Sequence, residues 1–138
     1  MSDPDRRRAL VRRWLAKART DLAVASVIAV QGADMDPWVG CFHGQQAAEK
    51  ALKAVLVAQG SEPPFIHNLT ALQALMPRDL DLGATAAELA DLSAAARGTR
   101  YVTDPTGSED PTWAEAEVAV IVAARVLAAV RAYLGEPG

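Results

Sequence analysis

The sequence is poor in several features that would point directly to a function. Its 138 residues include one cysteine, Cys41, and two histidines. One cysteine cannot form a disulfide within the chain, and with two histidines it cannot complete a tetrahedral zinc site unless carboxylates help. The sequence also lacks a Gly-rich phosphate loop of the Walker or dinucleotide-binding type. We therefore expect neither a metal nor a cofactor.

Long uncharged apolar runs are missing as well. The longest candidate, Val118 to Val130, contains Arg125 and is shorter than the roughly 20 residues that a membrane-spanning helix needs. The first residues are rich in Asp and Arg and contain no apolar core of a signal peptide. A lone cysteine is typical of a reducing compartment. These observations predict a soluble, cytoplasmic protein without membrane contact.

The charge is uneven along the chain. Residues 1–19 hold seven basic and two acidic side chains, which gives +5, whereas the remaining residues hold seven basic and fifteen acidic side chains, which gives −8. A basic first helix can contact RNA phosphates, dock on the acidic body of a second copy, or simply be solvated. The sequence leaves these three interpretations open.

The length fits one domain, residues 1–138, and the hydrophobic content of 51% is sufficient for a core. Aromatic residues make up only 5%, so the core is expected to rest on alanine and valine, which allow closely spaced helices. Apolar residues recur at helical spacing over Asp5–Gln31, which predicts a first helix. A second helix is predicted for Trp38–Gln59, with Asp36 as its N-cap and Pro37 in its first turn.

Three further helices follow from capping signals. Asn68 is a suitable N-cap for a short helix over Leu69–Met76. Thr85 and Glu88 have the spacing of a capping box, and the helix that they begin is expected to continue to about Arg97.

The last helix, which ends at Leu134, has two competing starts. These are Asp110 followed by Pro111, and a capping box of Thr112 with Glu115. No segment alternates in the two-residue period of a strand. The prediction is an all-α fold, a mostly antiparallel up-and-down helical bundle of three long and two short helices.

One polar stretch stands out within the second helix, residues 41–54. Phe42, Gln46, Glu49 and Lys53 recur at i, i+4, i+7 and i+11 and so form one stripe. Glu49 lies four residues before Lys53, a favourable order for a helical ion pair worth roughly 0.3–0.5 kcal/mol. The stripe is either a solvated helix face or a face that meets a partner helix or a nucleotide.

Two other places hold candidate binding groups. His67 precedes the cap of the short helix, where a lone histidine usually has a structural hydrogen-bonding role. Arg100 and Tyr101 begin a loop rich in Thr, Asp, Pro and Gly. This pair can bind a phosphate and stack on a base, or Tyr101 can simply attach the loop to the bundle.

The run FHGQQAAEKALKAVL, residues 42–56, together with His67-Asn68-Leu69 and Arg100-Tyr101, closely resembles the HEPN family (higher eukaryotes and prokaryotes nucleotide-binding). The resemblance extends from about Trp14 to Leu134. It implies a nucleotide-binding helical domain that forms a homodimer. The branch that this sequence resembles most is the short stand-alone type, often encoded beside a minimal nucleotidyltransferase, and it implies a role in a toxin–antitoxin or regulatory pair.

Many HEPN proteins are metal-independent ribonucleases with an Arg-x4–6-His motif, which this chain lacks. The nearest arginine upstream of both His43 and His67 is Arg19. The resemblance therefore favours a non-catalytic module that binds a nucleotide or a nucleotidyltransferase. The alternative is a ribonuclease toxin, active as a dimer, whose groups meet only in the fold. In that case His43 or His67 acts as acid and base, and Arg97 or Arg100 binds the phosphate.

These considerations define one set of candidate site residues and no catalytic residue. The candidates for nucleotide or partner binding are His43, Gln45, Gln46, Glu49, Lys50, Lys53, His67, Arg100 and Tyr101.

Overall fold

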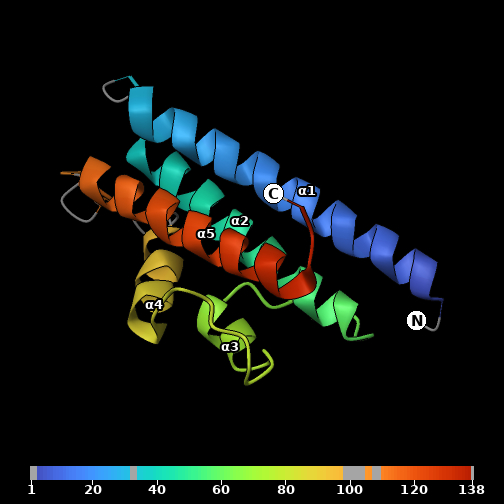
Figure 1. The fold of residues 1–138 in the computed structure, drawn as a ribbon. Coiled ribbons are helices and arrows are strands. Elements are labelled where there is room, and N and C mark those ends of the chain that lie inside the picture. Colours follow the sequence, from blue (N-terminus) through green and yellow to red (C-terminus); the bar gives the residue numbers. More distant parts are fainter. Residues whose placement is uncertain (1–2, 32–33, 98–104, 107–109, 138) are drawn as a thin grey trace.

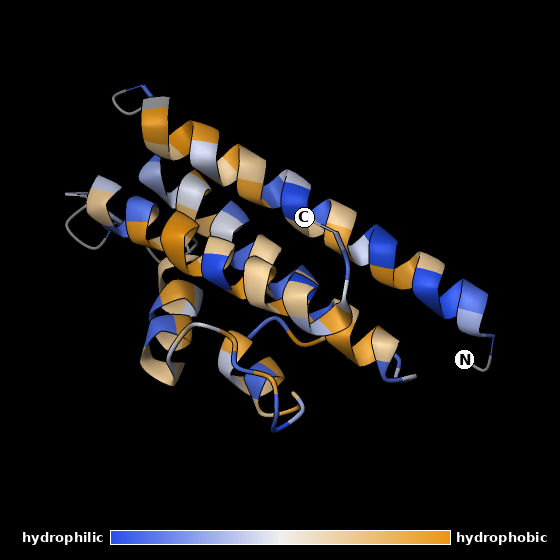
Figure 2. Cartoon of the chain, in the orientation of Figure 1, coloured by the Kyte–Doolittle hydropathy of each residue, from blue (hydrophilic) through white to orange (hydrophobic). Residues whose placement is uncertain are grey.

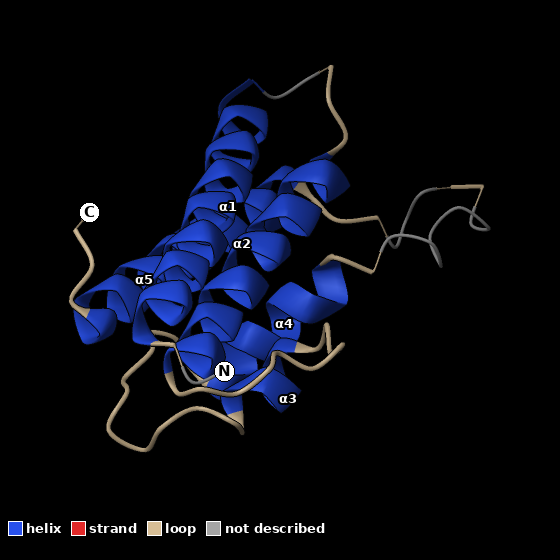
Figure 3. Cartoon of the chain, turned by 90° about the vertical axis from the view of Figure 1, so that its right-hand side faces the viewer, coloured by secondary structure: helices blue, strands red, loops and turns tan. Residues whose placement is uncertain are grey.

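The computed structural model describes residues 3–31, 34–97, 105–106 and 110–137. These residues form five helices and no strand (Figures 1 and 3). The helices are α1 (Pro4–Gln31), α2 (Pro37–Ala58), α3 (Leu69–Gln73), α4 (Ala86–Ala95) and α5 (Trp113–Leu134). The predicted all-α bundle of three long and two short helices is confirmed.

The three long helices lie side by side, with α3 and α4 on one side of them (Figure 1). Helix α1 runs antiparallel to α2. Helices α2 and α5 run in the same direction, because Gly40 lies against Ala116 and Gly44 lies against Ala119. The parallel pairing follows from α3 and α4, which return the chain to the start of α2 before α5 begins.

The predicted capping signals set most of the helix ends. The side chain of Asp36 accepts a hydrogen bond from the Trp38 N–H, and Asn68 caps α3. Of the two possible starts of α5, the capping box of Thr112 and Glu115 is the one that forms. Helix α3 is shorter than predicted and ends at Gln73, because the next residues continue in i→i+3 turns rather than in the α-helical pattern.

The core is built from small residues of α2 and α5 and from one stripe of α1. Val11, Leu15 and Ile28 of α1 are buried. On α5 the buried residues are Ala116, Ala119, Val122, Ala123, Val126, Leu127 and Val130. Trp113, Val120 and Leu134 are only half-buried, and Trp113 and Leu134 pack against this core from its edge. Helix α5 is apolar almost all around, so its sequence period does not define which side faces inward.

Hydrophilic residues concentrate in the first half of α1, as Figure 2 shows. Among the residues that the structure describes, none of the helices combines the length and the apolar character needed to cross a membrane.

Cys41 is expected to be unreactive as long as the protein stays folded. The thiol is fully buried, and burial, together with the carboxylates of Glu115 and Asp36, raises its pKa to about 11. At pH 8 we expect labelling by a thiol-specific disulfide reagent to be limited by unfolding, because the thiolate is the reactive form. The measurement is the labelling rate with and without urea, with glutathione as the exposed control.

Complete labelling of the native protein at the rate of glutathione would contradict this prediction.

The raised pKa of Cys41 also determines how the free energy of unfolding changes at high pH. Because the folded-state pKa lies above the ordinary value of 9.0, the contribution of Cys41 to stability is fully present below pH 9 and is lost as the pH rises toward 11.

Candidate functional site

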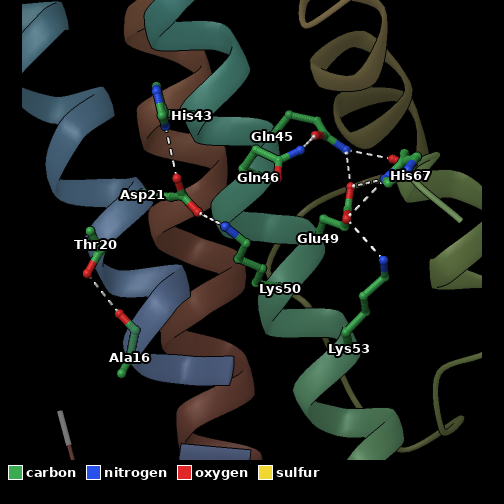
Figure 4. A network of polar contacts seen from close by, with 10 residues as sticks. All are labelled: Ala16, Thr20, Asp21, His43, Gln45, Gln46, Glu49, Lys50, Lys53 and His67. Atoms are coloured by element: carbon green, nitrogen blue, oxygen red, sulfur yellow. Dashed lines mark hydrogen bonds and ion pairs between the residues drawn. The ribbon is translucent and has the colours of Figure 1, made fainter. Parts of the chain in front are cut away.

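Helix α2 contributes most of the candidate site, and its polar side chains divide into two clusters (Figure 4). One cluster surrounds Glu49 on the side of α3 and α4. The other surrounds Asp21, which belongs to α1. Gln45 belongs to the Glu49 cluster, and its Oε1 accepts a hydrogen bond of 3.1 Å from Gln46 Nε2.

Glu49 is the centre of the first cluster. It is only 4% exposed, and both of its carboxylate oxygens have partners. Lys53 Nζ donates to Oε2 at 3.0 Å, and His67 Nδ1 lies 3.2 Å from each oxygen. Gln45 Nε2 donates to Oε1 at 3.3 Å and to the backbone oxygen of His67 at 2.6 Å. The cluster therefore fastens the segment before α3 to α2.

For Glu49 and Lys53, these contacts contradict both interpretations of the polar stripe, the solvated face and the binding face. Glu49 and Lys53 form neither a solvated face nor a face free for a partner helix, because Lys53 is only 5% exposed and Gln45 is buried with them. Phe42 and Gln46 remain half-buried. The reason is that the segment around His67 covers the stripe from within the same chain.

One ring nitrogen of His67, Nδ1, contacts Glu49, and the other, Nε2, lies on the exposed part of the ring. Its side chain is 75% exposed, and Nδ1 faces the Glu49 carboxylate, which can only accept. Nδ1 must therefore donate, and in the neutral ring this leaves Nε2 as an acceptor that solvent or a ligand can reach. The structural hydrogen bond expected of this histidine is present, and the ring edge remains accessible.

The second cluster joins α1 to α2. His43 Nδ1 lies 2.9 Å from Asp21 Oδ1, and Lys50 Nζ donates to Asp21 Oδ2. About a quarter of each of the His43 and Lys50 side chains is exposed, and Asp21 is nearly buried. His43 and Lys50 therefore connect α2 to α1 through Asp21.

A groove opens beside the Glu49 cluster, with a volume of about 450 Å³. Phe42, Gln45 and Gln46 of α2 form one wall. The other lining residues come from the α3 cap and from the end of α4: His67, Asn68, Ser93, Ala96 and Arg97. The groove thus combines an aromatic ring, amide groups, an exposed imidazole and the exposed Arg97 guanidinium.

Two hydrogen bonds fix the walls of this groove. Trp38 Nε1 donates to the backbone oxygen of Ala96 at 2.8 Å, which ties the start of α2 to the end of α4. The Leu69 N–H donates to Ser93 Oγ at 3.1 Å, which ties α3 to α4. The ring of Trp38 also lies 5.3 Å from that of Phe42. The groove is therefore held by three helices.

The structure brings together only part of the predicted set. Gln45, Gln46 and His67 line the groove. Glu49 and Lys53 form a buried ion pair that does not line it, and His43 and Lys50 contact Asp21. Arg100 and Tyr101 lie outside the described residues. Within the described ranges, no three Cys, His, Asp or Glu side chains gather closely enough to hold a metal ion.

Sequence reasoning missed Asp21 and the α4 side of the groove. Asp21 had a readable signal, because it is the only acidic residue between Arg6 and Gln31, and its spacing from Ala18 and Ala25 places it on the buried stripe. No sequence pattern could have identified Ser93 and Ala96, since nothing in the sequence indicates that α4 lies against α2.

A comparison with protein-family models finds a match to the HEPN domain over residues 11–133. The chain belongs to the HEPN family. Among solved structures, it is similar to TT1696 from Thermus thermophilus, with 30% identity, a TM-score of 0.70 and coverage of 88% of this chain and 96% of that one. It is also similar to ST0689, an archaeal HEPN homologue, with 27% identity, a TM-score of 0.69 and coverage of 90% and 97%. No curated protein matches.

Proposed function

We propose that this HEPN domain binds a nucleotide in the groove lined by Phe42, Gln46, His67 and Arg97, and that the domain acts by binding rather than by chemistry. The observation that supports the proposal is the convergence of the Phe42 ring, the half-buried Gln46 amide and the exposed Arg97 guanidinium on one groove. Its volume, about 450 Å³, lies within the range of roughly 300–1,000 Å³ typical of small-molecule sites.

Each of these groups can bind a different part of a nucleotide. An aromatic ring offers a stacking surface for any base, worth about 1–3 kcal/mol. The amide of Gln46 can both donate to and accept from a base edge. The guanidinium of Arg97 can form paired hydrogen bonds with phosphate oxygens, and His67 Nε2 adds a further polar contact.

The test is calorimetric titration and thermal unfolding of the protein with ATP, GTP and a short single-stranded RNA. A ligand at 100 times its dissociation constant adds about 2.7 kcal/mol of stability, which raises the melting temperature by several degrees in a domain of this size. Phe42→Leu should weaken binding about five-fold or more because the stacking surface is lost. Trp113→Leu, a half-buried aromatic residue outside the groove, is the matched control.

The proposal fails if none of these ligands binds, or if Phe42→Leu binds as tightly as the unchanged protein. Homodimer formation, a minimal nucleotidyltransferase as partner, and a place in a toxin–antitoxin or regulatory pair stay predictions from the family resemblance. The cytoplasmic location likewise stays a prediction.

A second candidate function, metal-independent RNA cleavage, is favoured by one contact. Glu49 holds His67 Nδ1, so Nε2 is oriented for proton transfer in the groove that also contains Arg97. If this candidate holds, the protein cleaves a fluorogenic RNA in EDTA, His67→Ala abolishes cleavage and His43→Ala retains it. No cleavage, or equal cleavage by the His67 variant, would exclude it.

A further inference from the structure

A second groove lies between α4 and α5, with a volume of about 380 Å³, and shares no lining residue with the candidate nucleotide site. Leu92 and Val122 are buried at its floor, and Val118 forms part of its α5 wall. Val118 is 54% exposed, and Ile121, one turn further along α5, is 50% exposed. The groove therefore offers an apolar floor that continues onto an exposed apolar edge of α5.

Every charged side chain that lines this groove within the described residues is acidic: Glu88, Asp91 and Glu115. Glu88 accepts a hydrogen bond from the Thr85 N–H and pairs with Arg125, and both contacts lower its pKa, the former more strongly. Glu115 closes the capping box of α5. Asp91 is exposed and forms no ion pair with another residue of the described ranges. The apolar floor is thus bordered by negative charge.

We propose that the α4–α5 groove docks a cationic amphipathic helix of a second protein. A helix laid into a groove between two helices places apolar side chains at i, i+3, i+4 and i+7 against the floor. Lysines or arginines beside those anchors then meet Asp91 and its neighbours at the rim. The same rim repels nucleic acid and acidic peptides, so the charge selects the class of partner.

Helix α1 of a second copy of this chain fits the groove less well. Its own basic helix, α1, packs its large apolar residues Val11 and Leu15 into its own core. The exposed valines of α1, Val27 and Val30, lie beyond the basic half of that helix. A copy of α1 therefore does not offer arginines and apolar anchors together, as the groove requires.

The first experiment measures binding of a fluorescein-labelled Leu/Lys amphipathic peptide of about 18 residues, long enough to form a helix, by fluorescence anisotropy. Saturable 1:1 binding is expected. Asp91→Lys should weaken it about ten-fold or more, because the rim charge is reversed. Glu62→Lys makes the same charge change at an exposed position beyond the end of α2 and should leave the affinity within about two-fold.

The second experiment tests the apolar part of the groove. Val118→Ser should weaken binding of the same peptide about three-fold or more, since an apolar contact area is lost. Val27→Ser alters a valine of nearly equal exposure, 52% against 54%, on α1 and should have no effect. A Leu/Glu peptide of the same length should not bind.

Three outcomes would overturn the proposal. If Asp91→Lys and Glu62→Lys weaken peptide binding equally, the peptide binds through the net charge of the protein and not at the groove. Unchanged affinity in Val118→Ser would mean that the groove is not the binding surface. Self-association of the unchanged protein that Val118→Lys abolishes, measured by sedimentation velocity, would assign the groove to a second copy instead.

Discussion

Replacing Lys53 with methionine is expected to destabilise the protein by about 3–5 kcal/mol, because it leaves a buried carboxylate without its cation. The side chains of Lys53 and Glu49 are each 6% exposed, and their charged atoms are 3.0 Å apart. Methionine keeps most of the apolar stem of lysine, so the change isolates the lost charge. Urea denaturation measures the loss, and the melting temperature should fall by roughly 10 °C or more.

Two further variants separate charge from packing. Glu49→Gln combined with Lys53→Met should recover most of the lost stability, since a neutral amide needs no counter-charge. Lys17→Met alters an exposed lysine of α1 and should change stability by no more than about 0.5 kcal/mol. A loss below about 1 kcal/mol in Lys53→Met alone would contradict the view that the buried Glu49 carboxylate depends on Lys53 as its counter-charge.

Replacing Arg97 with alanine is expected to weaken binding of a nucleoside triphosphate about ten-fold to a hundred-fold. A hydrogen bond to a charged group is worth about 1.5–3 kcal/mol, and Arg97 is the guanidinium at the rim of the proposed site. The corresponding nucleoside, which has no phosphate, should bind the variant and the unchanged protein with nearly equal affinity. Calorimetric titration of both ligands measures the two affinities.

The matched control for this prediction is Arg78→Ala. Arg78 is an exposed arginine in the turn after α3 and does not line the groove. It should leave both affinities unchanged. If Arg97→Ala and Arg78→Ala weaken triphosphate binding equally, the effect comes from net charge, and Arg97 is not the phosphate contact.

The fold was predictable from the sequence because its signals are local. A cap such as Asp36 before Pro37, or Thr85 three residues before Glu88, acts on backbone groups within one turn, and both form as the spacing predicts. Asp110 and Thr112 are both suitable N-caps for α5, and only the contacts of the folded chain decide that the Thr112 capping box forms.

The candidate site was less predictable because its geometry depends on contacts between distant segments. Helical spacing placed Glu49 and Lys53 on one stripe, and a charged stripe is normally solvated. The structure buries them under the segment around His67, 18 residues after Glu49. Arg97 reaches the same groove through the contact of Trp38 with Ala96, which spans 58 residues. No pattern within one helix encodes such contacts.

The most direct test of the proposed nucleotide site is a nuclear magnetic resonance titration of histidine-labelled protein with ATP. The chain has two histidines, one at the groove and one committed to Asp21, so each serves as the control for the other. If ATP binds in the groove, the imidazole signals of His67 should move in a saturable manner while those of His43 stay in place. Signals that do not move for either residue, or that move for His43 alone, would contradict a nucleotide site in this groove.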